Sequence, residues 1–114
     1  MAYENIEYNL VMTIVNRGFA ELVVDASRDA GATGGTIIFA RGTGVMDVAK
    51  FMDISIQPEK EIVLTLVRKD EAADIIHAIL EVAGLRTDAD GISFTLPVTD
   101  FVGLSSQSGM APKD

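Results

Sequence analysis

The stretch VMTIVNRGFAELVVDASRDAG (residues 11–31) is repeated in outline by VLTLVRKDEAADIIHAILEVAG (residues 63–84). Each copy opens with a continuous apolar run, V-M-T-I-V or V-L-T-L-V, which is typical of a strand in the centre of a sheet. Each copy then places apolar residues at a spacing of three and four, which indicates a helix with one buried face. The sequence therefore predicts a strand followed by a helix, twice.

Both expected helices have a recognisable apolar face and end. In the first helix the apolar face consists of Phe19, Leu22, Val23, Ala26 and Ala30. In the second it consists of Ile75, Ile76, Ile79, Leu80 and Val82. Acidic residues crowd the start of the second helix, where the helix dipole favours anions: Asp70, Glu71 and Asp74. Gly31 and Gly84 are placed to end the two helices.

A glycine-marked turn and a β-rich run follow each helix, GGTIIFA (residues 34–40) and DGISFTLPV (residues 90–98). The order β-α-β-β-α-β predicts an α+β, ferredoxin-like fold, in which a four-stranded antiparallel sheet has two helices on one face. The second and fourth strands are then the edges, which suits Pro97 because proline cannot donate to a ladder on both sides. Residues 36–39 would form an exposed apolar edge, so we expect another copy of the chain to cover it.

Composition limits the class of protein. The 114 residues suffice for one domain, and the 48% apolar content is high for a short chain, which favours a homo-oligomer. Seventeen acidic against nine basic residues give a net charge of −8, which argues against a nucleic-acid partner. The start MAYENIEYNL does not match a secretory signal, and no apolar run is long enough to span a membrane. We expect a cytoplasmic protein without direct membrane insertion.

Two segments fall outside the regular pattern. GVMDVAKFMDISIQPEKE (residues 44–61) is longer than a hairpin needs, and its composition predicts a short helical turn or a mobile loop. The tail SSQSGMAPKD, from Ser105, is polar and small, so we expect it to be poorly ordered.

Candidate chemistry is sparse. His77 is the only histidine, there is no cysteine, and no serine or second histidine lies at a useful spacing. We therefore expect a helix-surface or half-buried histidine, no metal site and no enzyme. The glycine-rich segments GATGG and RGTG could expose backbone N–H groups to phosphate oxygens, or could serve the fold alone. Arg41, beside the second segment, offers a planar donor fork suited to phosphate or carboxylate, or to an acid of the chain itself.

The segments GATGGTIIFARGTG, PEKEIVLTLV and DGISFTLPVTDFVGL, together with the long loop, resemble the PII signal-transduction proteins of nitrogen metabolism, and more closely a divergent PII-like branch. The resemblance implies a homotrimer that binds adenine nucleotides between subunits and controls a protein partner, such as a membrane transporter, through the T-loop after the second strand. It implies a PII-like domain over residues 9–104 with the T-loop at about 44–59. Residues 1–8 would be an N-terminal extension, and residues 105–114 a flexible tail.

The resemblance also implies site residues. The nucleotide-binding residues would be Gly35, Thr36, Arg41, Gly42, Thr43, Gly44, Asp90 and Gly91. The last two belong to the family's B-loop, here residues 86–91. The partner-binding loop would use Val45, Met46, Lys50, Phe51 and Met52.

The chain departs from the family pattern where classical members have cations. Ile92 stands in place of a lysine, and Val102, Gly103 and Leu104 stand where arginines end the fourth strand. Val45 and Met46 replace the arginine and the glutamine after the T-loop glycine, and the loop lacks the modified tyrosine of some members. We therefore expect neither the usual ATP binding nor 2-oxoglutarate sensing. The remaining nearby cations are Arg41, Lys50, Arg68, Lys69 and Arg86, which suit AMP, ADP or another adenine nucleotide such as a cyclic one.

The sequence thus predicts a PII-like regulator with no certain cofactor. Two rival hypotheses remain open. The first is a ligand-free trimeric assembly module of the same fold, in which the glycines serve packing alone. The second is an enzyme that uses the cleft, which would need His77.

Overall fold

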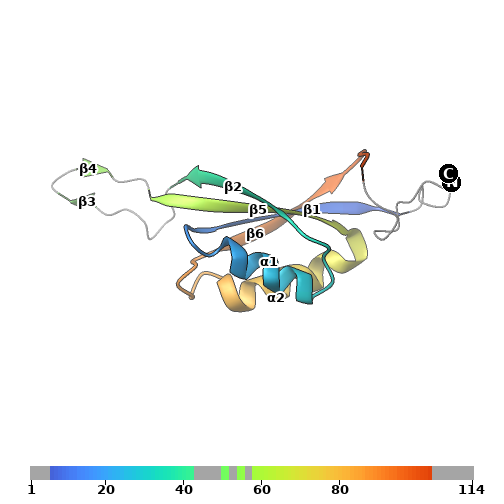
Figure 1. Ribbon diagram of the computed structural model, residues 1–114, viewed down its shortest axis with the longest axis horizontal. Coiled ribbons are helices and arrows are strands. Elements are labelled where there is room, and N and C mark those ends of the chain that lie inside the picture. The colour runs from blue at the N-terminus through green and yellow to red at the C-terminus, as the bar shows by residue number, and fades with distance from the viewer. Residues whose placement is uncertain (1–5, 43–49, 52–53, 56–57, 104–114) are drawn as a thin grey trace.

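The computed structural model describes residues 6–42, 50–51, 54–55 and 58–103 (Figure 1). The elements in chain order are β1 (Tyr8–Asn16), α1 (Ala20–Asp29), β2 (Thr36–Arg41), β3 (Lys50–Phe51), β4 (Ile54–Ser55), β5 (Glu59–Arg68), the 3-10 turn η2 (Lys69–Glu71), α2 (Ala72–Ala83) and β6 (Ile92–Val98). In this part of the chain no helix is long and apolar enough to cross a membrane.

Four strands form one antiparallel sheet in the order β2-β5-β1-β6. Both helices lie against the same face of this sheet, as Figure 1 shows. The two halves of the repeat provide the central strands, β1 and β5, and the edges are β2 and β6. The predicted ferredoxin-like fold is therefore confirmed, together with its edge strands.

The core lies between the helices and the two central strands. Alternate residues of β1 and β5 point towards the helices and are fully buried, among them Val11, Val15 and Val63. Ile75 and Ile79 of α2 are fully buried against them. Because a strand has a period of two, the other residues of β1 and β5 must lie on the opposite face.

The helices bury slightly different faces from those predicted. Leu22 and Val82 are 39% and 40% exposed, although both were expected in the apolar stripe. In α1 the buried positions are Ala20, Val23 and Ser27, and Leu22 lies about 100° around the helix from Val23. Ser27 is tolerated in the core because its hydroxyl donates to the Val24 carbonyl oxygen at 2.9 Å.

The sheet face opposite the helices is apolar. Its members are Leu10, Met12, Ile14, Ile38, Ile62, Leu64, Leu66, Ile92, Phe94 and Leu96, which strand pairing places in adjacent rows. None of them is buried, and Phe94 and Leu96 are each 41% exposed. No helix or strand of the described residues covers this surface, which we call the open face.

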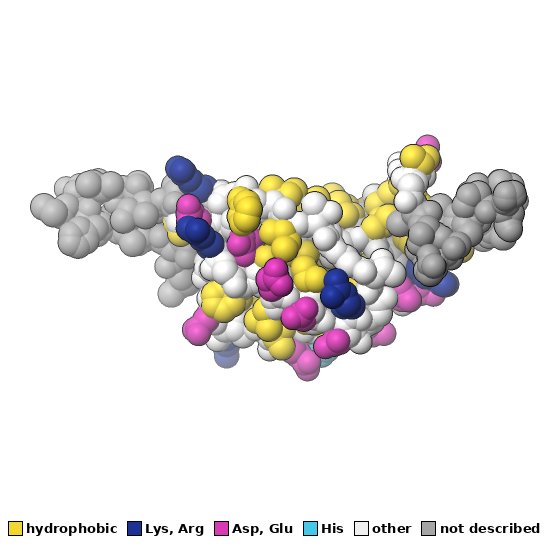
Figure 2. All heavy atoms as spheres, in the orientation of Figure 1, with side chains coloured by type: hydrophobic (Ala, Val, Ile, Leu, Met, Phe, Trp, Pro, Cys, Tyr) yellow, Lys and Arg dark blue, Asp and Glu magenta, His cyan; other side chains and the backbone are white. Residues whose placement is uncertain are grey.

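The edge strand β2 is exposed along almost its whole length, as predicted. Phe39 is 77% exposed, and Ile37 and Ile38 are also exposed. Figure 2 shows hydrophobic side chains gathered over β2 and α1, with acidic side chains around them. The edge therefore presents unpaired strand backbone and apolar side chains together, which is the arrangement that another chain commonly covers.

The described part of the long connection contains a small hairpin. Lys50 pairs with Ser55 and Phe51 with Ile54, so β3 and β4 form a two-stranded antiparallel unit. The expected short helical turn is therefore wrong for these residues, because an extended pair satisfies their backbone groups instead. The other residues of 43–57 and the residues from 104 onward lie outside the described residues. The expected poor order of the tail concerns these residues and therefore stays a prediction.

Candidate functional site

One end of the sheet gathers four segments that are far apart in the sequence. Here β2 and β1 end, and β5 and β6 begin. The two ends of the long connection meet where the Gly42 N–H donates to the Pro58 carbonyl oxygen at 3.2 Å. We call Gly42 and residues 58–60 the loop root. The turn of residues 84–91, which joins α2 to β6, lies across β1 from it.

Asn16, the last residue of β1, lies between Lys60 of the loop root and this turn. The Lys60 ammonium donates to the Asn16 side-chain oxygen (Nζ to Oδ1, 2.7 Å), and the Asn16 amide donates to the Asp88 carbonyl oxygen (Nδ2 to O, 3.1 Å). Lys60 is only 7% exposed, which is unusual for a lysine. Neither residue is among the site residues predicted from the sequence. Only the antiparallel pairing of β1 with β5 brings them together, and no local motif signals it.

Glu61 and Glu59 attach the start of β5 to the β1–α1 turn. One Glu61 carboxylate oxygen accepts the N–H groups of Gly18 and Ala20, each at 3.0 Å, and Glu61 is 8% exposed. This carboxylate supplies the N-terminal cap that α1 does not obtain from Phe19. Glu59 forms an exposed ion pair with Arg17.

Three of the predicted site glycines, Gly35, Gly42 and Gly91, differ in how closely they are packed. A Cβ at Gly35 would lie 3.1 Å from Val63 Cγ1 and 3.2 Å from the Leu64 carbonyl oxygen, so packing against β5 favours glycine there. A Cβ at Gly91 would lie 2.3 Å from the Ala83 carbonyl oxygen, which is a clash. A Cβ at Gly42 would meet only Lys60 Cγ, at 3.9 Å. Packing therefore explains Gly35 and Gly91, whereas no contact with a described residue explains the glycine at position 42.

The nucleotide-binding residues implied by the resemblance fall into separate groups. Gly35 and Thr36 lie at the start of β2, and Arg41 and Gly42 at its end, about 17 Å further along the strand. Asp90 and Gly91 lie at the opposite edge of the sheet, beside the end of β1. Asp90 has a φ of 50°, a left-handed conformation that aspartate tolerates.

Other predicted residues are placed only in part. Arg41 is exposed and forms no ion pair with any described residue. Lys50 and Phe51 form β3. Thr43, Gly44, Val45, Met46 and Met52 lie outside the described residues.

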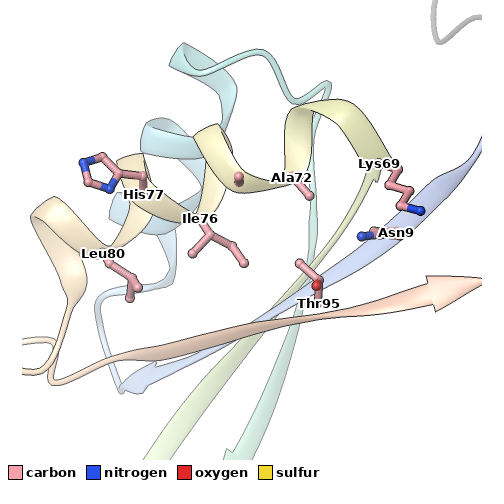
Figure 3. Close-up of a pocket in the computed structure, with 8 residues that line it drawn as sticks. Asn9, Lys69, Ala72, Ile76, His77, Leu80 and Thr95 are labelled. Carbon is pink, nitrogen blue, oxygen red and sulfur yellow. The ribbon is translucent and has the colours of Figure 1, made fainter.

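Two hollows of about 500 Å³ each flank α2. One lies at the 84–91 turn and is lined by Gly84, Arg86, Thr87 and Gly91 among others. The other lies between α2 and β6 and is shown in Figure 3, where Ile76 and Leu80 point towards Thr95. His77 also lines this hollow, and its side chain is 81% exposed, with its Nε2 3.8 Å from Glu81 Oε2. His77 is therefore a surface histidine, which is one of the two predicted placements.

No group of metal-ligating side chains occurs among residues 6–42, 50–51, 54–55 and 58–103. The family model of the nitrogen regulatory protein P-II matches residues 8–108. The chain belongs to the P-II family. A search of the curated proteins gives no match.

Solved structures of P-II-like proteins share the fold. A PII-like signalling protein from Thermus thermophilus is 20% identical, with a TM-score of 0.61, and the match covers 82% of this chain and 87% of that one. The Bacillus subtilis GlnK–ATP complex is 17% identical, with a TM-score of 0.63, and the match covers 82% and 83%. P-II proteins are signalling regulators, so the family membership agrees with the prediction that this chain is not an enzyme.

The position where classical P-II members end the fourth strand with arginines is apolar in the structure. Val102, at the first of these positions, is 95% exposed, and the residue before it, Phe101, packs edge-on against Tyr8 with ring centroids 5.0 Å apart. The lysine position after the B-loop glycine is taken by Ile92, which is 47% exposed on the open face. In this P-II chain the cations at the described end of the sheet are Arg17, Arg41, Lys60 and Arg86.

Proposed function

We propose that this P-II protein is a trimeric regulator that binds a small anionic effector, an adenine nucleotide, beside the loop root. The observation that carries the proposal is the meeting of Gly42, Lys60 and the 84–91 turn at one end of the sheet. Gly42, which has no close packing contact with a described residue, the largely buried Lys60 and a helix-to-strand turn together offer backbone N–H groups and positive charge to phosphate oxygens.

The effector site lies between subunits in this proposal. Thr36, where the family has a threonine near the adenine, is about 17 Å along β2 from Arg41, too far for one small ligand to contact both easily within one protomer. A second copy placed against the open face and the β2 edge would bring its own Thr36 to the loop root of the first. The apolar open face supports such an assembly, since a large apolar surface favours association.

The charges favour a ligand with fewer phosphates than ATP. The cations at this end of the sheet are Arg41, Arg86, Arg17, which forms an ion pair with Glu59, and Lys60, which donates to Asn16. Ile92 and Val102 add no charge where classical members have cations. We therefore propose ADP or AMP, although the GlnK structure that shares the fold was solved with ATP.

The long loop is the proposed output. A ligand beside Gly42 contacts the first residue of the connection that leads to the β3–β4 hairpin, so it can favour one loop conformation over another. A protein partner that binds that conformation better is then recruited or released. Such a partner is a membrane transporter by analogy with the family, and the regulator itself acts in the cytoplasm.

The test is isothermal titration of the purified chain with ATP, ADP, AMP and cyclic AMP, each with and without magnesium. The proposal expects ADP or AMP to bind and Lys60→Met to weaken that binding by about tenfold or more, since a charged hydrogen bond contributes about 1.5–3 kcal/mol. Arg28→Met removes a distant cation of α1 and is the matched control, with unchanged affinity expected. Absence of binding across the panel would refute the nucleotide effector.

The ligand-free assembly module is the second candidate, and one observation favours it. Gly35 and Gly91 are both explained by packing, so these glycines need no ligand. A trimer that binds nothing in the panel and keeps the same loop conformation would support this alternative.

A further inference from the structure

Asn16, the last residue of β1, contacts the segments on both sides of its strand. Its side-chain oxygen accepts from Lys60 Nζ at 2.7 Å, on the β5 side. Its side-chain nitrogen donates to the Asp88 carbonyl oxygen at 3.1 Å, on the β6 side. Its backbone N–H also donates to the Ala89 carbonyl oxygen at 2.9 Å.

The carboxamide makes the two side-chain contacts through separate atoms, one that accepts and one that donates. The Lys60 ammonium can only donate and the Asp88 carbonyl can only accept, so the residue between them needs one acceptor and one donor. These partners also fix which way the amide faces. Aspartate would keep an acceptor for Lys60 but would have no hydrogen for Asp88, and alanine would lose both contacts.

We propose that Asn16 is a positioning residue that couples the loop root to the 84–91 turn. Lys60 is the last residue of the loop root and Asp88 is in the middle of the turn, so the carboxamide joins two segments that β1 separates. A contact that fixes the position of the Lys60 ammonium then also stabilises the 84–91 turn, and a contact that fixes the turn also stabilises the position of Lys60.

The coupling gives the effector site a way to act on both segments. This step rests on the proposed function. A lysine ammonium has three donors, so Lys60 can hold Asn16 and an anion together. An anion on Lys60 therefore orders the loop root and the 84–91 turn in the same event.

The first test needs no ligand. Backbone hydrogen exchange is measured on the full chain for wild type, Asn16→Asp, Asn16→Ala, Lys60→Met and the double variant Asn16→Ala/Lys60→Met. Exchange in residues 84–91 should be about fivefold faster in Lys60→Met, although the change is on β5, because the lost contact is worth roughly one hydrogen bond. Asn16→Asp should speed up hydrogen exchange in the 84–91 turn, while exchange in the loop root stays at the wild-type rate.

Two further results decide the coupling. The double variant should loosen the turn no more than the stronger single variant, since both changes break one path. Thr13→Val, which removes the 2.8 Å hydroxyl contact from β1 to Ser93, is the control and should leave residues 58–60 and 84–91 unchanged. The proposal is overturned if Lys60→Met leaves the turn at wild-type exchange, or if Thr13→Val loosens both segments as much as Asn16→Ala.

The second test adds ADP. If wild type binds ADP, protection should rise at both segments together, and in Asn16→Asp it should rise at the loop root alone. A rise confined to one segment of wild type would overturn the coupling. If wild type binds no ADP, the nucleotide effector fails, while the ligand-free exchange result still decides whether Asn16 couples the two segments.

Discussion

Glu61 is predicted to be one of the most important polar residues for stability, because its carboxylate caps α1 from another element. The side chain is 8% exposed, and one oxygen accepts the N–H groups of Gly18 and Ala20 at 3.0 Å each. Hydrogen bonds to charged groups contribute about 1.5–3 kcal/mol each, and loss of a helix cap costs about 0.5–2 kcal/mol. Glu61→Ala leaves both donors without this acceptor, so we expect a loss of about 2–4 kcal/mol in the free energy of unfolding.

A conservative variant, Glu61→Gln, distinguishes the contribution of the negative charge from that of the hydrogen bonds. Glu61→Gln keeps one oxygen that can accept, so its loss should be smaller, about 1 kcal/mol. The assay is urea unfolding followed by circular dichroism, with all variants at one protein concentration because association would add to the apparent stability.

The neighbouring acid provides the control. Glu59 pairs with Arg17, but the two side chains are 55% and 68% exposed, and such surface pairs contribute about 0–1 kcal/mol. Glu59→Ala should therefore change stability far less than Glu61→Ala. Equal losses for the two variants, or a loss below about 0.5 kcal/mol for Glu61→Ala, would refute the capping role.

Further predictions concern the glycines and the open face. Gly91→Ala should destabilise the fold by about 2 kcal/mol or more, because its Cβ would lie 2.3 Å from the Ala83 carbonyl oxygen, and chemical unfolding would detect this loss. Gly42→Ala should keep stability within about 0.5 kcal/mol of wild type and yet lower nucleotide affinity in calorimetry. Phe94→Glu, on the open face, should dissociate the assembly in analytical ultracentrifugation, and an unchanged mass would contradict burial of that face between copies.

The sequence predicts the fold largely because the fold repeats. The apolar runs from Val11 and Val63 both read as central strands, and the structure pairs these two strands with each other. Pro97 and the exposed residues of the second strand identify the edges correctly, since an edge strand has different hydrogen-bonding needs from a central one. The buried face of each helix is predicted less accurately at its edges. Leu22 and Val82 are exposed, although their spacing places them in the predicted apolar faces.

The candidate site is predicted less completely, because its residues meet only through long-range pairing. Gly42 and Gly91 stand out in the sequence as glycines, although only the structure distinguishes a glycine required by packing from one that is not. Lys60, Asn16 and Glu61 carry no local signal. Lys60 and Glu61 begin a strand, where charged residues are common, and their partners are about forty residues away across the sheet.

The most direct test of the central claim is the mass of the native protein with and without ADP, measured by native mass spectrometry. A trimer that gains up to three ADP molecules in wild type, and gains none or few in Lys60→Met, is the predicted result. A chain that stays monomeric, or a trimer whose mass ADP does not change, would contradict a nucleotide site between subunits.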